Sequence, residues 1–115
     1  MSFSVVLSHS FKRSIKRLAK RYPRAKDDLR TALKALTDVP TLGVLIPGGS
    51  GTRKLRVRST DLARGKSGGF RLIYTVDYEA ERLYPLLVYA KTQQADIARR
   101  ELQRLLHDLK AELEA

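Results

Sequence analysis

The spacing of apolar residues changes along the chain, and each change marks a different expected element. Residues 3–7 form a short, β-branched apolar run that predicts a strand. Between residues 11 and 22 apolar side chains recur every three or four positions, which predicts an amphipathic helix with basic outer faces. Pro23 ends this helix, and a second apolar stripe over residues 25–36 predicts another helix, packed on the first as an antiparallel hairpin.

The second half of the chain alternates between turn-forming and strand-forming segments. Residues 37–52 are rich in Pro and Gly and predict a loop, although the apolar residues Leu42, Val44, Leu45 and Ile46 suggest that part of it packs on the core. Residues 54–58, 70–77 and 83–90 predict three strands, of which the last is apolar on both faces and therefore interior to a sheet. Leucines at helical spacing over residues 95–113 predict a C-terminal helix.

These elements define a fold class. Three consecutive strands with short connections pair as antiparallel neighbours, and the N-terminal strand is expected to join their sheet. We therefore predict an α+β fold in the order β-α-α-β-β-β-α, with a small antiparallel sheet, an N-terminal helical hairpin and a C-terminal helix. Because no repeat, linker or low-complexity segment interrupts the chain, we interpret residues 1–115 as one domain.

Positive charge is concentrated in two segments. The 115 residues carry 23 Lys and Arg against 12 Asp and Glu, a net charge of +11. Residues 12–30 hold nine cations and two anions, and residues 53–71 hold seven cations and one anion, whereas the stretch after residue 71 is slightly negative. Such clustering is typical of proteins that bind a polyanion, either nucleic acid or an anionic protein or membrane surface. The alternative is a generally basic protein that its charge keeps soluble.

Several function classes are excluded or disfavoured by what the chain lacks. It has no cysteine, so a disulfide, a thiolate nucleophile and a Cys-based zinc site are excluded. Its two histidines, His9 and His107, are far apart and have no neighbours at ligand spacing, so we expect neither a catalytic metal nor a cofactor. No segment resembles a signal peptide or a membrane span, and we expect a cytoplasmic protein without a membrane partner.

Three cations alternate with apolar residues in the first of the three consecutive strands. Lys54, Arg56 and Arg58 share one face of that strand, with side chains about 7 Å apart. Like charges on one face repel, so the row makes sense if an anion lies across it, and otherwise it is a solvated sheet face. Arg71, in the next strand, reaches the same face if the two strands are in register.

The loop and strands around this row contribute further candidates. Arg64 and Lys66 lie in the loop that joins the two strands. Tyr74 and Tyr89 fall in the same region of the sheet, where they either stack on a base and bind phosphate, or belong to the core with only a polar tip.

Three motifs containing these residues resemble a known family. They read GSGTRKLRVR at residues 49–58, GKSGGFRLIY at residues 65–74 and LVYAK at residues 87–91. The pattern resembles the RelE/ParE superfamily of toxin–antitoxin toxins, and within it the RelE/HigB type of mRNA interferase, over essentially the full length of the chain.

The resemblance implies an activity and partners. It implies a RelE-like toxin that cleaves mRNA in the ribosomal A site, by metal-independent attack of a ribose 2′-OH on the adjacent phosphate. Such a toxin inhibits translation and is neutralised by an antitoxin, so the implied partners are a cognate antitoxin, the ribosome with its rRNA, and mRNA. Carried over by position, Lys54 and Arg56 match the family's basic strand pair, and Arg71 matches its phosphate-clamping arginine.

The chemistry of these residues suits that reaction. An Arg fork complements the charge that develops on phosphate oxygens in the transition state, which makes Arg71 the candidate clamp. Cationic neighbours disfavour the charged form of Lys54, which makes it the candidate general base. The remaining candidates for binding RNA or phosphate are Arg53, Arg58, Arg64, Lys66, Tyr74 and Tyr89.

Two positions depart from the RelE pattern. The RelE type has an arginine directly after the third motif and a tyrosine at the start of the last helix, where this chain has Thr92 and Ala98. The acid that protonates the leaving 5′ oxygen is therefore open among Lys91, Lys66 and Arg64. We include Lys91 with the catalytic candidates.

The predicted helical hairpin has its own expected role. In the family this hairpin and the sheet contact ribosomal RNA and an antitoxin, and counterion release would supply salt-dependent affinity for rRNA. The candidate docking residues are Lys12, Arg13, Lys16, Arg17, Lys20 and Arg21.

Two rival interpretations stay open. The first is a ParE-type gyrase poison, which shares the fold but lacks the basic catalytic row, so that Lys54, Arg56 and Arg71 argue against it. The second is a catalytically inactive, toxin-like module that only binds an antitoxin or RNA, an interpretation that Thr92 and Ala98 support.

Overall fold

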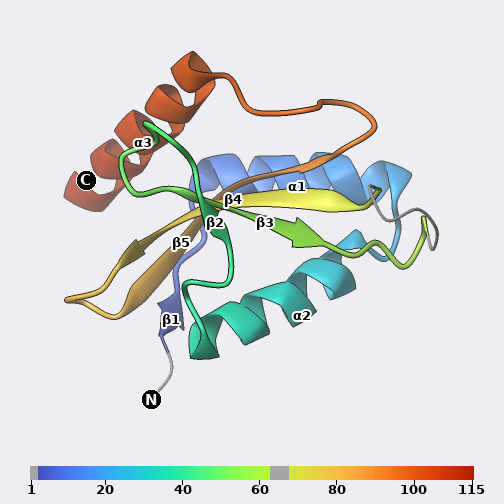
Figure 1. Ribbon diagram of the computed structural model, residues 1–115, viewed down its shortest axis with the longest axis horizontal. Coiled ribbons are helices and arrows are strands. Elements are labelled where there is room, and N and C mark those ends of the chain that lie inside the picture. The colour runs from blue at the N-terminus through green and yellow to red at the C-terminus, as the bar shows by residue number, and fades with distance from the viewer. Residues whose placement is uncertain (1–2, 63–67) are drawn as a thin grey trace.

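The chain folds into a five-stranded sheet with three helices (Figure 1). The computed structural model describes residues 3–62 and 68–115. In chain order the elements are β1 (Ser4–Val5), α1 (His9–Arg21), α2 (Ala25–Asp38), β2 (Val44–Leu45), β3 (Arg53–Val57), β4 (Phe70–Asp77), β5 (Arg82–Ala90) and α3 (Arg99–Glu114). No helix in these described ranges is long and apolar enough to cross a bilayer.

The sheet has the strand order β1-β5-β4-β3-β2. Neighbouring strands from β2 to β5 pair antiparallel, and β1 pairs parallel with β5 after the excursion through α1 and α2. The α+β class is thereby confirmed, as are the N-terminal strand in the sheet and β5 as an interior strand. A bulge between Ile73 and Tyr74 shifts the β4–β5 register by one residue.

The extra strand β2 lies in the segment predicted as a loop, and its side chains bear on one expectation. Leu42, Val44 and Leu45 are exposed, with Val44 at 72%, so these three do not contribute to the core contact predicted for part of the segment. Only Ile46 of that group packs against buried residues. The segment is anchored by its backbone instead, because the N–H of Gly43 donates to the Tyr74 hydroxyl at 2.8 Å.

Helix α3 begins four residues later than the leucine spacing predicts. Its N-cap is Ala98, and residues 95–98 form an irregular lead. Local polar contacts occupy the backbone there, since the Ile97 N–H donates to the Asp96 carboxylate at 2.9 Å and the Gln94 amide donates to the Asp96 carbonyl at 3.0 Å. Such side-chain contacts compete with helix formation. Because the helix begins at Arg99, Asp96 lies in the irregular segment before it.

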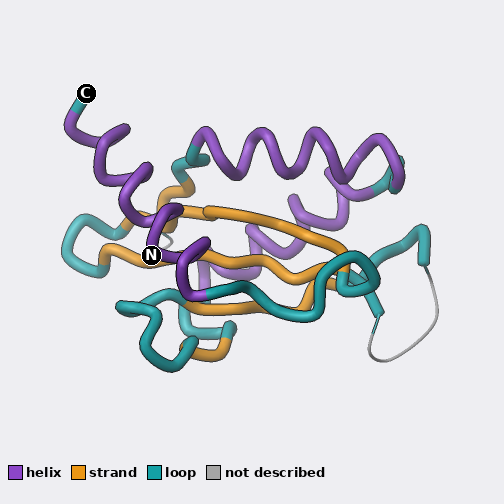
Figure 2. Tube along the Cα trace, turned by 90° about the horizontal axis from the view of Figure 1, so that it is seen from above, coloured by secondary structure: helices purple, strands orange, loops and turns teal. Residues whose placement is uncertain are grey.

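The sheet separates two hydrophobic clusters. On one face, residues of β3, β4 and β5 such as Val57, Phe70 and Leu72 pack against α1 and α2. Figure 2 shows α1 running along one side of the strands. On the other face, Ile73, Leu86 and Tyr89 join the leucines of α3 in a second cluster; those leucines are Leu102, Leu105 and Leu109. Strand alternation therefore decides which side chains meet the helical hairpin and which meet α3.

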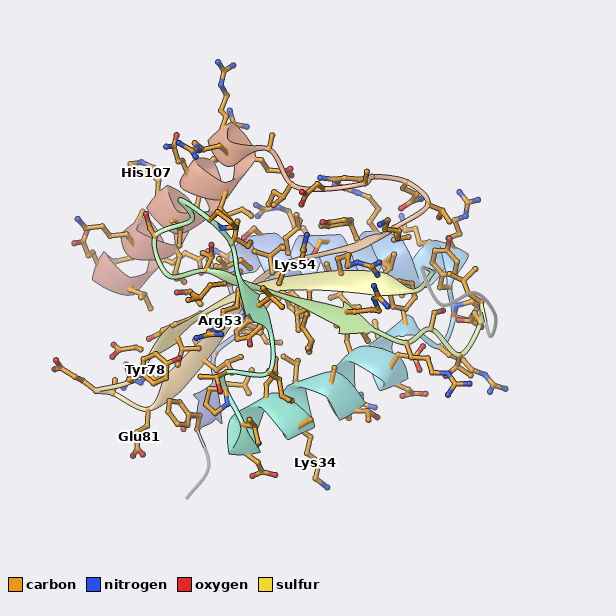
Figure 3. All side chains as sticks on the ribbon, in the orientation of Figure 1. Lys34, Arg53, Lys54, Tyr78, Glu81 and His107 are labelled. Carbon is orange, nitrogen blue, oxygen red and sulfur yellow. The ribbon has the colours of Figure 1, made fainter. Side chains whose placement is uncertain are left out.

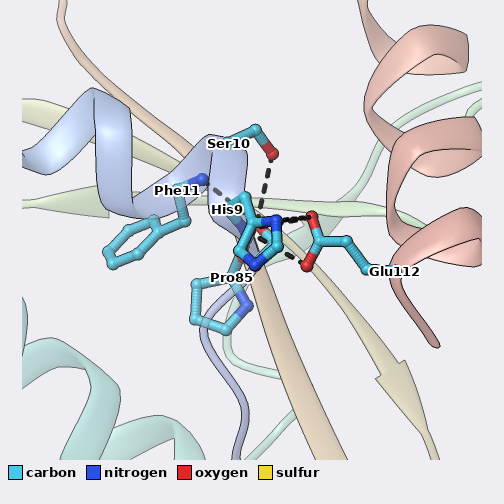
Figure 4. Close-up of polar contacts among 6 residues, drawn as sticks. His9, Ser10, Phe11, Pro85 and Glu112 are labelled. Carbon is cyan, nitrogen blue, oxygen red and sulfur yellow. Dashed lines mark hydrogen bonds and ion pairs between the residues drawn. The ribbon is translucent and has the colours of Figure 1, made fainter. Parts of the chain in front are cut away.

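Strand β1 pairs with the first two residues of β5. Further along β5, serines at the start of α1 bond to its backbone. The Ser8 hydroxyl caps the helix by accepting from the Phe11 N–H at 3.1 Å and donates to the Pro85 carbonyl at 2.9 Å (Figure 4). Six residues after Ser8, the Ser14 hydroxyl accepts from the Val88 N–H at 3.1 Å. Buried serines thus replace the hydrogen bonds that a neighbouring strand would supply.

The far end of α3 is tied to the same corner. The carboxylate of Glu112 accepts from the backbone N–H of His9 at 3.0 and 3.2 Å, and Figure 4 shows it beside the imidazole. His9 is exposed and follows the N-cap of α1, where a carboxylate complements the helix dipole. His9 therefore contributes to the contact between α1 and α3. It belongs to a different element from Lys54 and Arg56, which lie in β3.

Candidate functional site

The register of the sheet brings four predicted side chains to one face. Arg56 of β3 lies directly opposite Arg71 of β4, and Arg71 lies opposite Tyr89 of β5. Lys54 is two residues before Arg56 and therefore shares its face. We call Lys54, Arg56, Arg71 and Tyr89 the basic row. It runs across three strands on the face that also carries α3.

Arg71 is the most buried cation of the basic row. The residue is only 5% exposed, and its Nη1 donates to the carbonyls of Gly68 at 3.1 Å and Phe70 at 3.2 Å. Burial lowers the pKa of Arg71, the charge of Arg56 lowers it further, and Tyr89 acts in the opposite direction. A guanidinium that is desolvated beside a second guanidinium is held at an electrostatic cost that an anion between them would offset.

Tyr89 is the neutral member of the basic row. It is 6% exposed, and within the described part of the chain its hydroxyl has no hydrogen-bond partner. Burial raises the pKa of this phenol, the negative charge of Asp96 raises it further, and Arg71 partly counters both. The phenol is therefore protonated at neutral pH and retains an unused donor beside Arg71.

Lys54 has a partner that sequence reasoning missed. Its Nζ lies 3.3 Å from Oδ1 of Asp96, in the lead to α3, with the lysine side chain 34% and the aspartate 70% exposed. The N–H of Ile97 lowers the pKa of Asp96 most, and the bond and charge of Lys54 and the charge of Lys91 add to the effect. Asp96 falls inside the helix predicted over residues 95–113, so no local pattern indicated that its side chain reaches Lys54.

This ion pair bears on the role expected for Lys54. A neighbouring carboxylate favours the ammonium form of a lysine, whereas a general base must be neutral. In this structure Lys54 faces a carboxylate as well as its cationic neighbours. The role of Lys54 as general base stays a prediction, and the Asp96 contact must break for the amine to act on a substrate.

Two other predicted ligands, Tyr74 and Arg53, lie on the opposite face of the sheet. Tyr74 is fully buried, and its hydroxyl donates to the Pro40 carbonyl at 2.7 Å while it accepts from Gly43. Arg53 pairs with Tyr74 across the strands, and its Nη1 donates to the carbonyls of Gly43 at 2.7 Å and Thr41 at 3.4 Å. Both side chains hold the segment before β2, and Figure 3 shows Arg53 and Lys54 leaving β3 in different directions.

The remaining candidates lie around the basic row or outside the described residues. Arg58 is exposed just beyond β3, and Lys91 follows β5 and is partly exposed. Arg64 and Lys66 lie outside the described residues. Thr92 is exposed in the segment after β5, and Ala98 is the N-cap of α3. The six predicted docking cations are all exposed on α1, namely Lys12, Arg13, Lys16, Arg17, Lys20 and Arg21.

A small cavity connects the basic face of α1 to the basic row. Its volume is about 110 Å³, and its lining includes Arg17 and Arg21 of α1, Tyr89 of β5 and Glu101 of α3. Two cations of the first positive segment, Arg17 and Arg21, thus lie near Tyr89, the neutral member of the basic row. In the described ranges no three His, Asp or Glu side chains gather as metal ligands would.

Comparisons with known proteins identify relatives of the whole arrangement. A family model described as the ParE toxin of the type II toxin–antitoxin system parDE matches residues 5–87. A chain of the toxin–antitoxin complex RelBE2 from Mycobacterium tuberculosis is similar with a TM-score of 0.59 and 23% identity, over 78% of this chain and 99% of that one. A free double mutant of the E. coli toxin RelE is similar with a TM-score of 0.58 and 20% identity, over 83% and 90%. At these identities the two structures establish a shared fold.

Proposed function

This chain belongs to the ParE toxin family of type II toxin–antitoxin systems, and from the chemistry of its basic row we propose that it is a toxin that cleaves mRNA on the ribosome. It is a toxin of the RelE/ParE superfamily, whose members include enzymes and non-enzymes. The choice between these modes of action depends on the chemistry of the site. The residues of the basic row supply that chemistry.

The observation that carries the proposal is the pairing of Arg56 with Arg71 across β3 and β4. Two guanidiniums side by side, one of them buried, form a site for a group with several negatively charged oxygens. A phosphodiester that passes through a pentacoordinate transition state gains negative charge on those oxygens. Preorganised cations that bind the transition state more strongly than the ground state accelerate this step.

The reaction needs proton transfers at two oxygens. The ribose 2′-OH loses its proton and attacks the adjacent phosphorus, the bond from phosphorus to the 5′ oxygen breaks, and that oxygen takes up a proton. The products are a 2′,3′-cyclic phosphate and a 5′-OH end. We assign the base role to Lys54 once it has left Asp96, and Arg56 and Arg71 hold the phosphate. The acid is one of Lys91, Lys66 and Arg64, and Tyr89 supplies a donor to phosphate or ribose.

The partners follow from charge and from the fold relatives. The α1 cations, together with the cavity that links them to Tyr89, provide a surface for ribosomal RNA next to the reacting phosphate. One fold relative is described as part of a toxin–antitoxin complex. We propose an antitoxin partner for this chain as well, with acidic residues that cover the basic row.

The test is to map mRNA 5′ ends after brief induction of the toxin. We expect new ends inside translated codons, and Arg71→Ala is expected to reduce them about 10²- to 10³-fold because it removes a transition-state contact. Arg56→Ala provides a second variant at an exposed position, and Arg104→Ala on the outer face of α3 is the matched control. Cleavage by Arg71→Ala and Arg56→Ala at the wild-type level would overturn the assignment of the site.

The second candidate is a ParE-type gyrase poison, which the family match itself favours. A toxin of that kind acts on a protein–DNA complex and has no need of a phosphate clamp. Induction would then trigger the DNA-damage response while mRNA stays intact. That outcome, with Arg71→Ala as active as wild type, would replace the first candidate by the second.

A further inference from the structure

A cleft of about 290 Å³ lies directly beside Lys54, between the β2 segment and the start of α3. This volume is at the lower end of the range for small-molecule sites and fits a single base better than a larger ligand. Its walls are mostly apolar, and its charged groups are Lys54, Asp96 and Arg99. The lining residues that contribute the apolar walls are Val44, Leu45, Ile46, Pro47, Ile97 and Leu102.

Arg99 is placed in this cleft by the glycine-rich turn after β2. A Cβ on Gly48 would lie 2.7 Å from Nη2 of Arg99, so the bare backbone of Gly48 leaves room for the guanidinium against the turn. Gly48 also has φ +67°, a backbone conformation that side chains rarely adopt. The glycine-rich turn leads into the first sequence motif, at residues 49–58. The proposed phosphate binding by Arg56 and Arg71 does not explain why this turn is there.

Asp96 offers the cleft an open acceptor. Its Oδ1 receives the Ile97 N–H and Lys54, whereas the described residues give Oδ2 no hydrogen bond. A carboxylate accepts only, and Lys and Arg donate only. The charged groups of the cleft are therefore one acceptor, the Asp96 carboxylate, and two donors, Lys54 and Arg99. They lie among apolar walls.

Building on the proposed RNA cleavage, we propose that this cleft is a guanine-binding subsite for a nucleotide next to the cleaved phosphate. Guanine has two adjacent donors, N1–H and the 2-amino group, that match both oxygens of Asp96. Its O6 and N7 acceptors match a guanidinium such as that of Arg99. Adenine, cytosine and uracil each present one donor group to a carboxylate and leave one oxygen unused.

The position of the cleft supports this assignment. Lys54 lies two residues from Arg56 along β3, which separates their Cα atoms by about 7 Å. A phosphate held by Arg56 and Arg71 thus lies within one nucleotide of the cleft. Single-stranded RNA is commonly read in this way, with the base in an apolar slot and its edges hydrogen-bonded.

The subsite also accounts for the ion pair that restrains Lys54. A guanine that uses both carboxylate oxygens takes Oδ1 from Lys54, so base recognition releases the lysine toward the phosphate. Recognition of the correct base and activation of Lys54 become one event. Asp96 is then a positioning residue for catalysis and a contact residue for specificity.

The subsite is tested by titrating the isolated toxin with the 5′-monophosphates of guanosine, adenosine and cytidine, followed by NMR of the Ile97 and Leu102 methyl groups. We expect GMP to bind at least about tenfold more tightly than AMP or CMP. Asp96→Asn and Arg99→Ala are each expected to remove most of this preference. The matched controls, Asp38→Asn at the end of α2 and Arg100→Ala beside Arg99, should retain it.

Equal affinity for the three nucleotides, or an undiminished preference in Asp96→Asn, would overturn the subsite. The titration needs no RNA cleavage, so it gives a result even where the proposed function fails. Conversely, mapped cuts without guanine enrichment beside them, together with equal nucleotide affinities, would remove the subsite and leave the nuclease in place. GMP preference in a protein that cuts no message would retain the guanine site and reject the nuclease.

Discussion

Tyr74 and Tyr89 are both buried, but the stability of the protein should respond differently when each loses its hydroxyl. Tyr74→Phe removes two hydrogen bonds, to the carbonyl of Pro40 at 2.7 Å and from the N–H of Gly43 at 2.8 Å. It also leaves the buried Gly43 N–H without its partner. Tyr89→Phe removes a hydroxyl that is buried without a hydrogen-bond partner in the described part of the chain.

The magnitudes follow from these contacts. A net hydrogen bond contributes about 1 kcal/mol and an orphaned buried donor costs about 1–3 kcal/mol, so Tyr74→Phe should lower the free energy of unfolding by about 2–3 kcal/mol. For a domain of this size that is a Tm about 8–12 °C lower. Tyr89→Phe instead removes an uncompensated desolvation penalty and should change the free energy by about 0 to +1 kcal/mol.

Urea unfolding followed by circular dichroism measures both variants under identical conditions. Equal slopes m in wild type and variants would show that the midpoints report stability and not a change in the unfolded state. The reasoning is refuted if Tyr89→Phe is destabilised as much as Tyr74→Phe. Because Tyr89 lies opposite Arg71, its variant should also lose RNA cleavage while it keeps stability, which separates the two roles.

Three further outcomes are expected. The pKa of Asp96 is lowered in the folded state, so the ionised carboxylate stabilises the protein above its ordinary pKa of 3.8, and this contribution is lost as the pH falls. The Tm difference between wild type and Asp96→Asn should therefore vanish in acid. A difference that persists in acid would contradict the contacts assigned to the carboxylate, the Lys54 pair among them. Ser14→Ala leaves the Val88 N–H unpaired and should cost about 1–3 kcal/mol in urea unfolding, unless water replaces the hydroxyl. Gly69→Ala, at φ +82° with its new Cβ 2.5 Å from a β3 carbonyl, should cost at least about 1 kcal/mol and disturb the β3–β4 pairing; unaltered amide exchange in β3 would refute this.

Much of the fold was predictable because its elements depend on local patterns. The 3.6-residue stripe of α1 and the apolar runs of β4 and β5 identified those elements nearly to their ends. The error at the start of α3 arose where side chains bond to their own backbone, since such contacts are invisible to a count of leucines. The error at β2 arose because a hydrogen bond from Gly43 to distant Tyr74 replaces apolar packing there.

The candidate site shows the same division. Strand alternation placed Lys54 and Arg56 together, and it also implied that Arg53 and Tyr74 face away from them, since Arg53 is adjacent to Lys54 and Tyr74 is three residues from Arg71. Strand alternation in the sequence therefore already places Arg53 and Tyr74 on the face away from Lys54 and Arg71.

By itself the sequence determined the element types, the concentration of positive charge and the identity of the cationic strand, because periodicity and charge are properties of neighbouring residues. Tertiary structure alone decided that Arg71 meets both Arg56 and Tyr89, that Asp96 reaches Lys54, and that Arg99 lies against Gly48 beside the cleft. These contacts depend on strand register and on where two loops return to the sheet. Both are set by the packing of the whole core, which no local pattern encodes.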